Sequence, residues 1–280
     1  MENDTILVTG GTGTLGSLVV PRLRDARRNV RVLSRSGGSA EAGVELVTGD
    51  LATGEGIDAA VEGAEIVVHL AGSSKGDEDK ARHLVQAASK SGVRHLVYIS
   101  VVGADRIPVV SAVDRAMFGY FASKLAAERV VAESGVPYTT LRATQFHDLI
   151  LKTVEQAARL PVVPVPAGVR FQPIDADEVA ARLVELALAE PAGLVPDVAG
   201  PKIYELRELA RSFLRARGKR RPIVAIRLPG RAAQAFREGA NLAPERAVGG
   251  RTWEEFLADR VSPASERRSG VTSRAEGARS

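Results

Sequence analysis

The sequence contains no cysteine, which excludes disulfide bonds and any zinc site built on thiolates. The histidines show no metal-ligand spacing, so we expect no bound metal; they are His69, His83, His95 and His147. No segment approaches the roughly 20 apolar residues of a membrane span, and no stretch has the pattern of a signal peptide. These absences predict a soluble, cytoplasmic protein with no membrane partner.

Aromatic residues are scarce as well, at 4% of the 280 residues, but 45% of the residues are hydrophobic, which is enough for a sizeable core. The chain is mildly basic, with a net charge of +4 and a pI near 9.6. Between Arg211 and Arg231, eight cationic residues occur without an acidic one. No known nucleic-acid-binding motif lies there, so we favour a solvated helix end and loop and expect no nucleic-acid partner.

Short β-branched segments alternate with longer amphipathic ones, which predicts an α/β fold with a doubly wound parallel sheet, the Rossmann fold. The predicted strands are Ile6–Thr9, Val30–Ser34, Glu45–Thr48, Ile66–Leu70, Leu96–Ser100 and Tyr138–Arg142. The predicted helices between them are Leu15–Arg27, Ile57–Glu62, Asp77–Ser91 and Arg115–Glu133. In such a sheet, ligands bind where the strands end, so the turns after the strands are expected to carry function.

Beyond Arg142 the alternation loosens and prolines interrupt it. The elements expected in this half are helices at Asp175–Leu188, Tyr204–Arg217 and Trp253–Arg260, and a strand at Val195–Val198. We expect one NAD(P)-binding domain over residues 1–262. It includes small C-terminal elements on the substrate side, at about 143–173 and 190–262. Residues 263–280 are rich in Ser, Arg, Glu and Gly and are expected to be a disordered tail.

A glycine-rich turn follows the first predicted strand and opens the first helix. It comprises Gly10, Gly11, Thr12, Gly13, Thr14, Leu15 and Gly16, and it satisfies the dinucleotide fingerprint. The glycines allow a tight turn, a close approach of the backbone to a pyrophosphate, and tight packing of helix on strand. The positive end of the helix then holds the phosphates. We therefore predict that these residues bind a dinucleotide.

The end of the second predicted strand indicates which dinucleotide. A site that prefers NAD places a carboxylate there to bind the ribose 2′-hydroxyl, but this chain has Ser34 and Arg35. Arginine suits a 2′-phosphate, which favours NADP (NADPH) over NAD, although Arg35 could also be an ordinary surface residue. After the third strand, Asp50 and Leu51 are candidates for contact with the adenine, and Asp50 capping its own turn is the alternative.

Tyr120 and Lys124 are four residues apart in a predicted helix, so their side chains share one face. A neighbouring ammonium stabilises a phenolate and is expected to lower the pKa of Tyr120. Lys124 could also bind the nicotinamide ribose. Ser100, at the end of the fifth predicted strand, is expected to face the pair and hold a substrate carbonyl. These three residues are the predicted catalytic set.

Several motifs together resemble the atypical or extended short-chain dehydrogenase/reductases of the NmrA-like, NAD(P)-binding kind. They are Thr9–Gly16, Gly49-Asp50-Leu51, His69-Leu70-Ala71-Gly72, Val97-Tyr98-Ile99-Ser100, Tyr120–Glu128 and Val136–Arg142. The resemblance implies a Rossmann fold with NAD(P) at the strand ends, where Ala71 and Gly72 contact the cofactor. It also implies that Tyr120 donates a proton, Lys124 assists it and Ser100 holds the carbonyl. An asparagine that many members carry in the helix over Asp77–Ser91 is absent here.

Three functions follow from this resemblance. The first is an NAD(P)H-dependent oxidoreductase that reduces a carbonyl or quinone-like small molecule. The second is an NmrA-like redox sensor that binds NADP and a regulatory protein partner without turnover. The third, ranked last, is a nucleotide-sugar epimerase or dehydratase. Whether the chain forms a homodimer stays open. The role of His147 is open as well, because it could line the substrate pocket or cap the helix after it.

Overall fold

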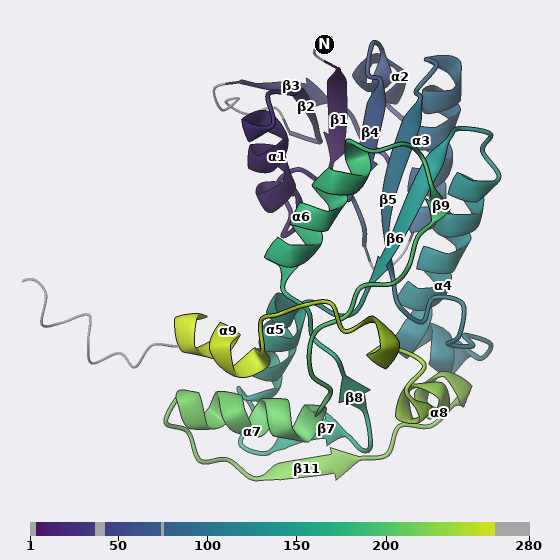
Figure 1. The fold of residues 1–280 in the computed structure, drawn as a ribbon. Coiled ribbons are helices and arrows are strands. Elements are labelled where there is room, and N and C mark those ends of the chain that lie inside the picture. Colours follow the sequence, from purple (N-terminus) through teal and green to yellow (C-terminus); the bar gives the residue numbers. More distant parts are fainter. Residues whose placement is uncertain (1–3, 37–42, 74–75, 261–280) are drawn as a thin grey trace, which may run out of the picture.

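A parallel sheet of seven strands forms the centre of the computed structural model, which describes residues 4–36, 43–73 and 76–260 (Figure 1). Its order is β3-β2-β1-β4-β5-β6-β9. The strands are β1 (Thr5–Thr9), β2 (Asn29–Ser34), β3 (Val44–Thr48), β4 (Ile66–His69), β5 (His95–Val101), β6 (Tyr138–Ala143) and β9 (Gly193–Leu194). The strand order reverses between β1 and β4, as in a Rossmann fold. The predicted α/β class is confirmed.

The central strands were predictable because a parallel strand covered on both faces is a short apolar segment. All residues of β4 and β5 are buried, and the predicted strands up to Arg142 agree with the structure to within one or two residues. The predicted strand Val195–Val198 was wrong. The strand there is β9, which ends at Leu194. Beyond it, the N–H of Val195 donates to Thr140 of β6 at 3.1 Å, and Val198 forms a single isolated bridge to Ala143.

Helices cover both faces of the sheet, and each predicted helix up to Leu188 is present with slightly different ends. One face carries α1 (Gly16–Asp25) and α6 (Ala176–Ala187), which pack together over β1 and β4. The other carries α2 (Ile57–Val61), α3 (Asp77–Lys90) and α4 (Ala112–Ala132). Figure 1 shows the two layers, with α6 in front of the sheet and α4 beside β6.

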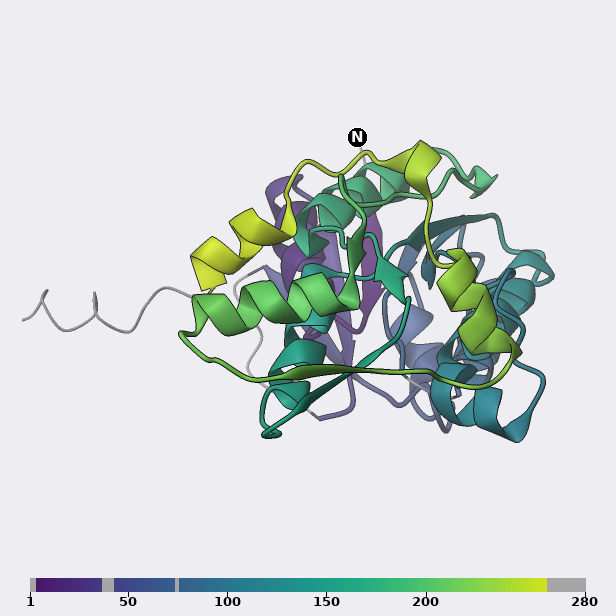
Figure 2. The same cartoon turned by 90° about the horizontal axis from the view of Figure 1, so that it is seen from below.

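A smaller lobe lies below the sheet in Figure 1, on the side to which β6 leads. Its helices are α5 (His147–Ala157), α7 (Leu206–Ala216), α8 (Arg231–Glu238) and α9 (Trp253–Arg260), with a short 3₁₀ turn at Pro244–Arg246. Its strands are β7 (Val163–Pro166), β8 (Arg170–Phe171), β10 (Tyr204–Glu205) and β11 (Ile223–Ile226). Seen from below in Figure 2, β11 runs across the lobe between α7 and α8. Among the described residues, no helix combines the length and the apolar character needed to span a membrane.

The lobe has its own core, centred on Trp253, Phe256 and Phe213. The predicted helix Tyr204–Arg217 begins two residues later than expected, because Tyr204 and Glu205 pair with β8. The helix at Trp253–Arg260 was predicted correctly. The predicted tail, residues 263–280, lies outside the described residues.

An ion pair joins the sheet to α4. Arg142 of β6 donates to both carboxylate oxygens of Glu128, at 2.9 and 2.7 Å, and both side chains are only 10% exposed. The guanidinium also lies 2.8 Å from the carboxylate of Asp105. Side chains alternate between the two faces of a strand, and the Arg142 side chain is on the face towards α4. Glu128 lies one turn of helix beyond Lys124. This contact therefore fixes α4 against the sheet close to the predicted catalytic pair.

Removal of Arg142 should reveal how strongly α4 is held. Arg142→Met leaves the Glu128 carboxylate buried without its main partner, so we expect a loss of about 3–5 kcal/mol in the free energy of unfolding, measured in urea. The double variant Arg142→Met with Glu128→Leu should recover most of it. Arg182→Met is the matched control, because its 2.9 Å pair with Glu185 is exposed and worth below about 1 kcal/mol. Equal losses in the two single variants would contradict this account.

Candidate functional site

The glycine turn has the geometry that its sequence predicts. Gly10 has φ +70°, and a Cβ there would lie 2.8 Å from the backbone nitrogen of Ala71. A Cβ on Gly16 would lie 2.2 Å from the carbonyl oxygen of Gly10. The turn itself therefore requires glycine at these two positions. Gly13 is different, because it is exposed and the nearest atom to its Cβ position is the Gly10 oxygen, at 3.3 Å.

The turn leads directly into α1, whose N-terminus suits an anion. No side chain caps this end, and the first turn contains no acidic residue, so none of the described residues competes for the positive end of the helix. Thr12, Gly13 and Thr14 are exposed, whereas Leu15 buries its side chain in the core beneath α1. Leu15 can therefore contribute only backbone groups. The residues present fit a pyrophosphate held by backbone N–H groups.

The ends of β2 and β3 lie beside each other, because the N–H of Gly49 donates to the carbonyl of Ser34 at 3.0 Å. Arg35 is exposed, and its guanidinium contacts no carboxylate within the part of the chain that the structure describes. Asp50 accepts a 2.8 Å hydrogen bond from the N–H of Ala52 through one oxygen, so it does cap its own turn. Leu51 is buried in the core, so only its backbone can face a ligand.

The turn after β4 connects the glycine turn to the predicted catalytic helix. Ala71 contacts Gly10, as described above, and its N–H donates to Thr9 Oγ1 at 3.2 Å. The next residue, Gly72, lies against Lys124. A Cβ on Gly72 would be 3.1 Å from Lys124 Nζ. The structure thus brings the predicted pyrophosphate site, Ala71, Gly72 and Lys124 into one continuous surface.

Lys124 is buried, and its ammonium has three close partners. The Nζ atom donates to the carbonyl of Ile99 at 3.2 Å and to the hydroxyl of Tyr98 at 3.3 Å, and it lies 3.3 Å from Asp77 Oδ2. Burial lowers the pKa of Lys124, and the Asp77 carboxylate opposes that effect. The sequence analysis missed Asp77 and Tyr98. Asp77 stands among three acidic residues that open α3, which is an ordinary helix start, so no sequence signal distinguished it.

The pKa of Tyr120 differs from the prediction. Desolvation of the hydroxyl, followed by the negative charge of Asp77, raises the pKa of Tyr120 above its ordinary value, instead of Lys124 lowering it. Lys124 Nζ lies 5.8 Å from the centre of the Tyr120 ring, while Asp77 sits closer to the ammonium and offsets its charge. Tyr120 therefore stays protonated at neutral pH.

Ser100 lies on β5 one residue after Ile99, whose carbonyl accepts from Lys124. The alternation of the strand places Ser100 on the same face as Tyr98, which packs beneath α3 and α4. The Ser100 hydroxyl is buried and has no hydrogen-bond partner among the described residues. A buried hydroxyl without a partner is uncommon in folded proteins and points to a group that a ligand can satisfy.

A family model described as NAD(P)H-binding matches residues 10–190, which is more than half of the chain and includes the glycine turn, Lys124 and Ser100. The chain belongs to the NAD(P)H-binding family. This agrees with the resemblance to the atypical short-chain dehydrogenase/reductases, and NAD(P)H is its cofactor.

Relatives of this NAD(P)H-binding protein include ceramide reductase of Caulobacter vibrioides, 31% identical over 208 residues. That match covers 68% of this chain but only 63% of the relative. Quinone oxidoreductase 2 of Escherichia coli is 26% identical over 223 residues, with 76% and 75% of the two chains covered. The solved structure of the NADPH-dependent quinone oxidoreductase of Escherichia coli with NADPH shares the fold. Its TM-score is 0.76 at 21% identity, and 91% and 99% of the chains are covered.

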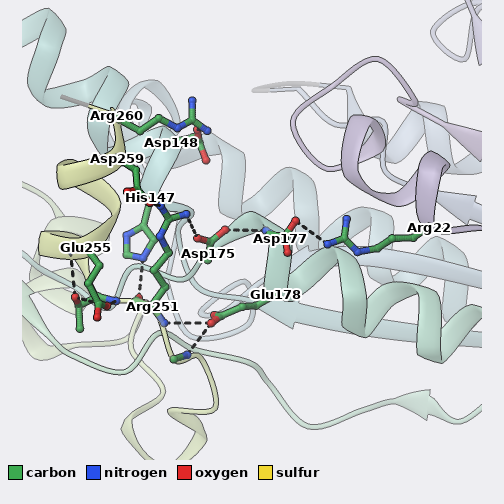
Figure 3. Close-up of polar contacts among 12 residues, drawn as sticks. Arg22, His147, Asp148, Asp175, Asp177, Glu178, Arg251, Glu255, Asp259 and Arg260 are labelled. Carbon is green, nitrogen blue, oxygen red and sulfur yellow. Dashed lines mark hydrogen bonds and ion pairs between the residues drawn. The ribbon is translucent and has the colours of Figure 1, made fainter. Parts of the chain in front are cut away.

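His147 of this NAD(P)H-binding chain neither caps α5 nor faces the Lys124 site. The cap position of α5 is Phe146, and no side-chain hydrogen bond caps the helix. The His147 ring is buried against Phe256 of α9, with ring centres 5.0 Å apart, and its Nε2 donates to the carbonyl of Arg251 at 3.1 Å. Figure 3 shows His147 beside this carbonyl. Its role is to hold the last helix of the lobe.

Arg251 extends that contact towards the sheet (Figure 3). Its guanidinium lies 2.7 Å from the carboxylate of Asp175, the residue that caps α6. The backbone N–H of Arg251 donates to the Glu178 carboxylate at 3.1 Å. In the first turn of α6, Asp177 pairs with Arg22 of α1 at 2.7 Å. This chain of ion pairs connects α9 to α6 and α1. No group of three or more acidic or histidine side chains within the described ranges is placed to hold a metal.

The basic segment 211–231 lies elsewhere, on the outer side of the lobe. It covers the end of α7, β11 and the start of α8, which Figure 1 places at the bottom of the molecule. Arg217 pairs with Glu155 at 3.2 Å, and Arg221 donates to the carbonyl of Arg159 at 3.2 Å. This segment does not contribute to the surface formed by the glycine turn and Lys124.

The exposed position of Gly13 allows binding to be tested apart from folding. In Gly13→Ala the new methyl group occupies space next to the turn, where a pyrophosphate must approach, so NADPH binding should weaken at least tenfold, or about 1.4 kcal/mol. The midpoint of thermal unfolding should change little. Fluorescence titration with NADPH measures the affinity, and calorimetry measures the midpoint of thermal unfolding.

The control for Gly13→Ala is Gly119→Ala. Gly119 lies inside α4, and its Cβ position has no atom within 4 Å, so neither quantity should fall. Unchanged NADPH affinity in Gly13→Ala would show that the dinucleotide does not lie on this turn.

Proposed function

We propose that the protein is an NADPH-dependent reductase of a carbonyl or quinone-like small molecule. The proposal rests on two close approaches, that of Gly10 to Ala71 and that of the next residue, Gly72, to Lys124. It places a dinucleotide-binding turn next to a buried ammonium, on the helix that also carries Tyr120. The names of two relatives, ceramide reductase and quinone oxidoreductase 2, support a reductase and describe different substrates.

The preference for NADPH rests on the end of β2. The position after Ser34, where a carboxylate would bind a ribose 2′-hydroxyl, is Arg35. Its guanidinium is exposed and pairs with no described carboxylate, so it is available for the 2′-phosphate. Ser34 donates to the carbonyl of Ser36 at 2.6 Å and thereby holds the loop that presents Arg35. The glycine turn and the N-terminus of α1 would hold the pyrophosphate.

When bound, NADPH supplies a hydride to the carbonyl carbon. Tyr120 donates its proton to the carbonyl oxygen, which becomes the hydroxyl of the product. Burial and then the Asp77 charge raise the pKa of Tyr120, so the phenol is protonated before the reaction. The Lys124 ammonium lies 5.8 Å from the centre of the ring, with Asp77 offsetting its charge. Tyr120 is partly exposed, so solvent can return the proton. For a quinone, hydride addition to one carbonyl carbon and protonation of that carbonyl's oxygen by Tyr120 would give a hydroxycyclohexadienone, which tautomerises to the hydroquinone.

Two further residues prepare this reaction. The Ser100 hydroxyl, which has no partner among the described residues, would donate a hydrogen bond to the substrate oxygen once its covering neighbours move. Asp77 keeps the buried Lys124 charged, because without a carboxylate nearby, burial would favour the neutral amine. A cytoplasmic location, a homodimer and a regulatory partner all stay predictions from the sequence.

Arg35 should determine the choice between the two cofactors. Arg35→Ala removes a charge-assisted hydrogen bond to the 2′-phosphate, worth about 1.5–3 kcal/mol, so the dissociation constant of NADPH should rise at least tenfold. The dissociation constant of NADH should not change. Arg129→Ala, which alters an exposed arginine on α4, should affect neither. The measurement is fluorescence titration with both dinucleotides, and an equal effect on NADH and NADPH would exclude this role for Arg35.

Tyr120→Phe should abolish turnover and leave NADPH binding largely intact. Loss of a positioned general acid reduces kcat by about 10²–10⁴-fold. The assay follows NADPH oxidation at saturating NADPH with a panel of benzoquinones and aromatic aldehydes. Tyr138→Phe is the control, because Tyr138 lies at the opposite end of the sheet, at the start of β6. Retained turnover in Tyr120→Phe contradicts the proposed role, whereas tight NADPH binding without turnover in the unmodified protein favours the redox sensor.

A further inference from the structure

An apolar stripe extends from the Tyr120–Lys124 pair towards the start of α4. Val113, Met117 and Tyr120 are four and three residues apart, and Lys124 follows after another four. This spacing places all four side chains on one face of the helix. Val110, one residue before the helix cap Ser111, is an exposed apolar residue as well. We use the term α4 stripe for Val110, Val113 and Met117.

Exposure along this face changes in one direction. Val110 is 58% exposed, Val113 46%, Met117 42% and Tyr120 37%, whereas Lys124 is only 3% exposed. The stripe therefore leads from solvent to the buried ammonium. Other exposed apolar side chains, such as Leu188 and Val248, do not lie beside chemically active groups. Single exposed apolar residues are ordinary, but a contiguous set next to a site indicates that a ligand covers it.

The face of α4 next to the stripe, about 100° further around the helix, is fixed, so the stripe cannot turn into the protein. Phe118 and Phe121 pack on Phe236 of α8, with ring centres 5.2 and 5.4 Å apart. The carboxylate of Asp114 accepts a 3.1 Å hydrogen bond from the N–H of Ala232 at the start of α8. Figure 2 shows α8 beside α4. These contacts hold the stripe towards solvent.

We propose that the α4 stripe binds the hydrocarbon part of the substrate, and that the substrate is a quinone or ketone with an extended alkyl chain. Helical side chains lean towards the helix N-terminus, so the Tyr120 ring lies over the turn that contains Met117. A carbonyl oxygen at the Tyr120 hydroxyl therefore places the rest of the molecule against Met117 first and Val113 next. None of the three stripe residues is charged, which suits hydrocarbon and excludes an ionic tail.

The length of the stripe sets the length of chain that it can bind. From Tyr120 to Val113 the helix rises by about 10 Å, which corresponds to an alkyl chain of roughly eight carbons. Full burial of one methylene group favours binding by about fourfold. Contact with one wall gives about half of that free energy, so we expect about a twofold gain for each methylene until the chain passes Val113.

The test uses 2-alkyl-1,4-benzoquinones, from the methyl to the octyl compound, with NADPH in excess. The kcat/KM should rise about twofold with each methylene, while kcat changes little. The variant Val113→Thr with Met117→Gln keeps the size of both side chains but makes them polar. It should reduce the octyl-to-methyl ratio of kcat/KM at least tenfold.

The matched control is Val224→Thr with Leu188→Gln. These residues lie on β11 and at the end of α6, and their exposed fractions, 49% and 39%, are close to those of Val113 and Met117. The control should keep the full octyl-to-methyl ratio. A flat series in the unmodified protein, or an unchanged ratio in the stripe variant, would overturn the inference. So would a change of oligomeric state in the stripe variant by sedimentation equilibrium, because a second copy would then cover the stripe.

This inference rests on the proposed function, but a second measurement separates the two. If no quinone is reduced, the reductase proposal fails, and binding alone then tests the stripe. The probes are 6-propionyl- and 6-octanoyl-2-dimethylaminonaphthalene, ketones whose emission shifts to the blue in apolar surroundings. Tighter binding of the octanoyl compound, lost in the stripe variant and kept in the control, supports the stripe. Equal binding of both compounds overturns it.

Discussion

The burial of one positive charge organises the candidate site. The ammonium of Lys124, which belongs to α4, lies against the end of β5 and the start of α3. A buried ammonium is stable only where hydrogen bonds and an opposite charge replace water. Asp77 supplies the charge, and Tyr98 and Ile99 accept the remaining hydrogen bonds. Because these partners come from α3 and β5, the position of α4 relative to the sheet is set by the same contacts that hold Lys124. The Arg142–Glu128 pair, one turn further along α4, strengthens that alignment.

Much of the sheet could be predicted from the sequence, because a buried parallel strand is a short apolar segment and a dinucleotide turn is a spacing of glycines. The lobe could not. Its two small sheets have strands of two to four residues with prolines at 164 and 166, which carry no periodic pattern. The α8 helix was missed as well, and α5 was expected only as a helix after His147, without bounds. Their amphipathic faces match the core of the lobe, but that core forms only when segments distant in sequence come together.

The candidate site divides in the same way. Gly10, Lys124 and Ser100 could be predicted because each belongs to a motif with a known spacing. Asp77 and the pKa of Tyr120 could not, because both depend on what lies nearby in space. Burial of the hydroxyl, and then the charge of Asp77, raises the pKa of Tyr120. A tyrosine four residues before a lysine indicates a lowered pKa only if the ammonium has no closer counter-charge. Here the Lys124 ammonium has Asp77 as its counter-charge, so its positive charge is already balanced.

The lobe depends on the last described helix, which bears on how the protein is made. Trp253 and Phe256 of α9 occupy the centre of the core against which α5 and α7 pack. The sheet, in contrast, is complete once the chain has reached β9 at Leu194. During synthesis the sheet can therefore form while the ribosome still adds residues, whereas the apolar faces of α5 and α7 wait for α9. The apolar faces of these two helices therefore stay uncovered in this core until α9 has been made and has folded onto them.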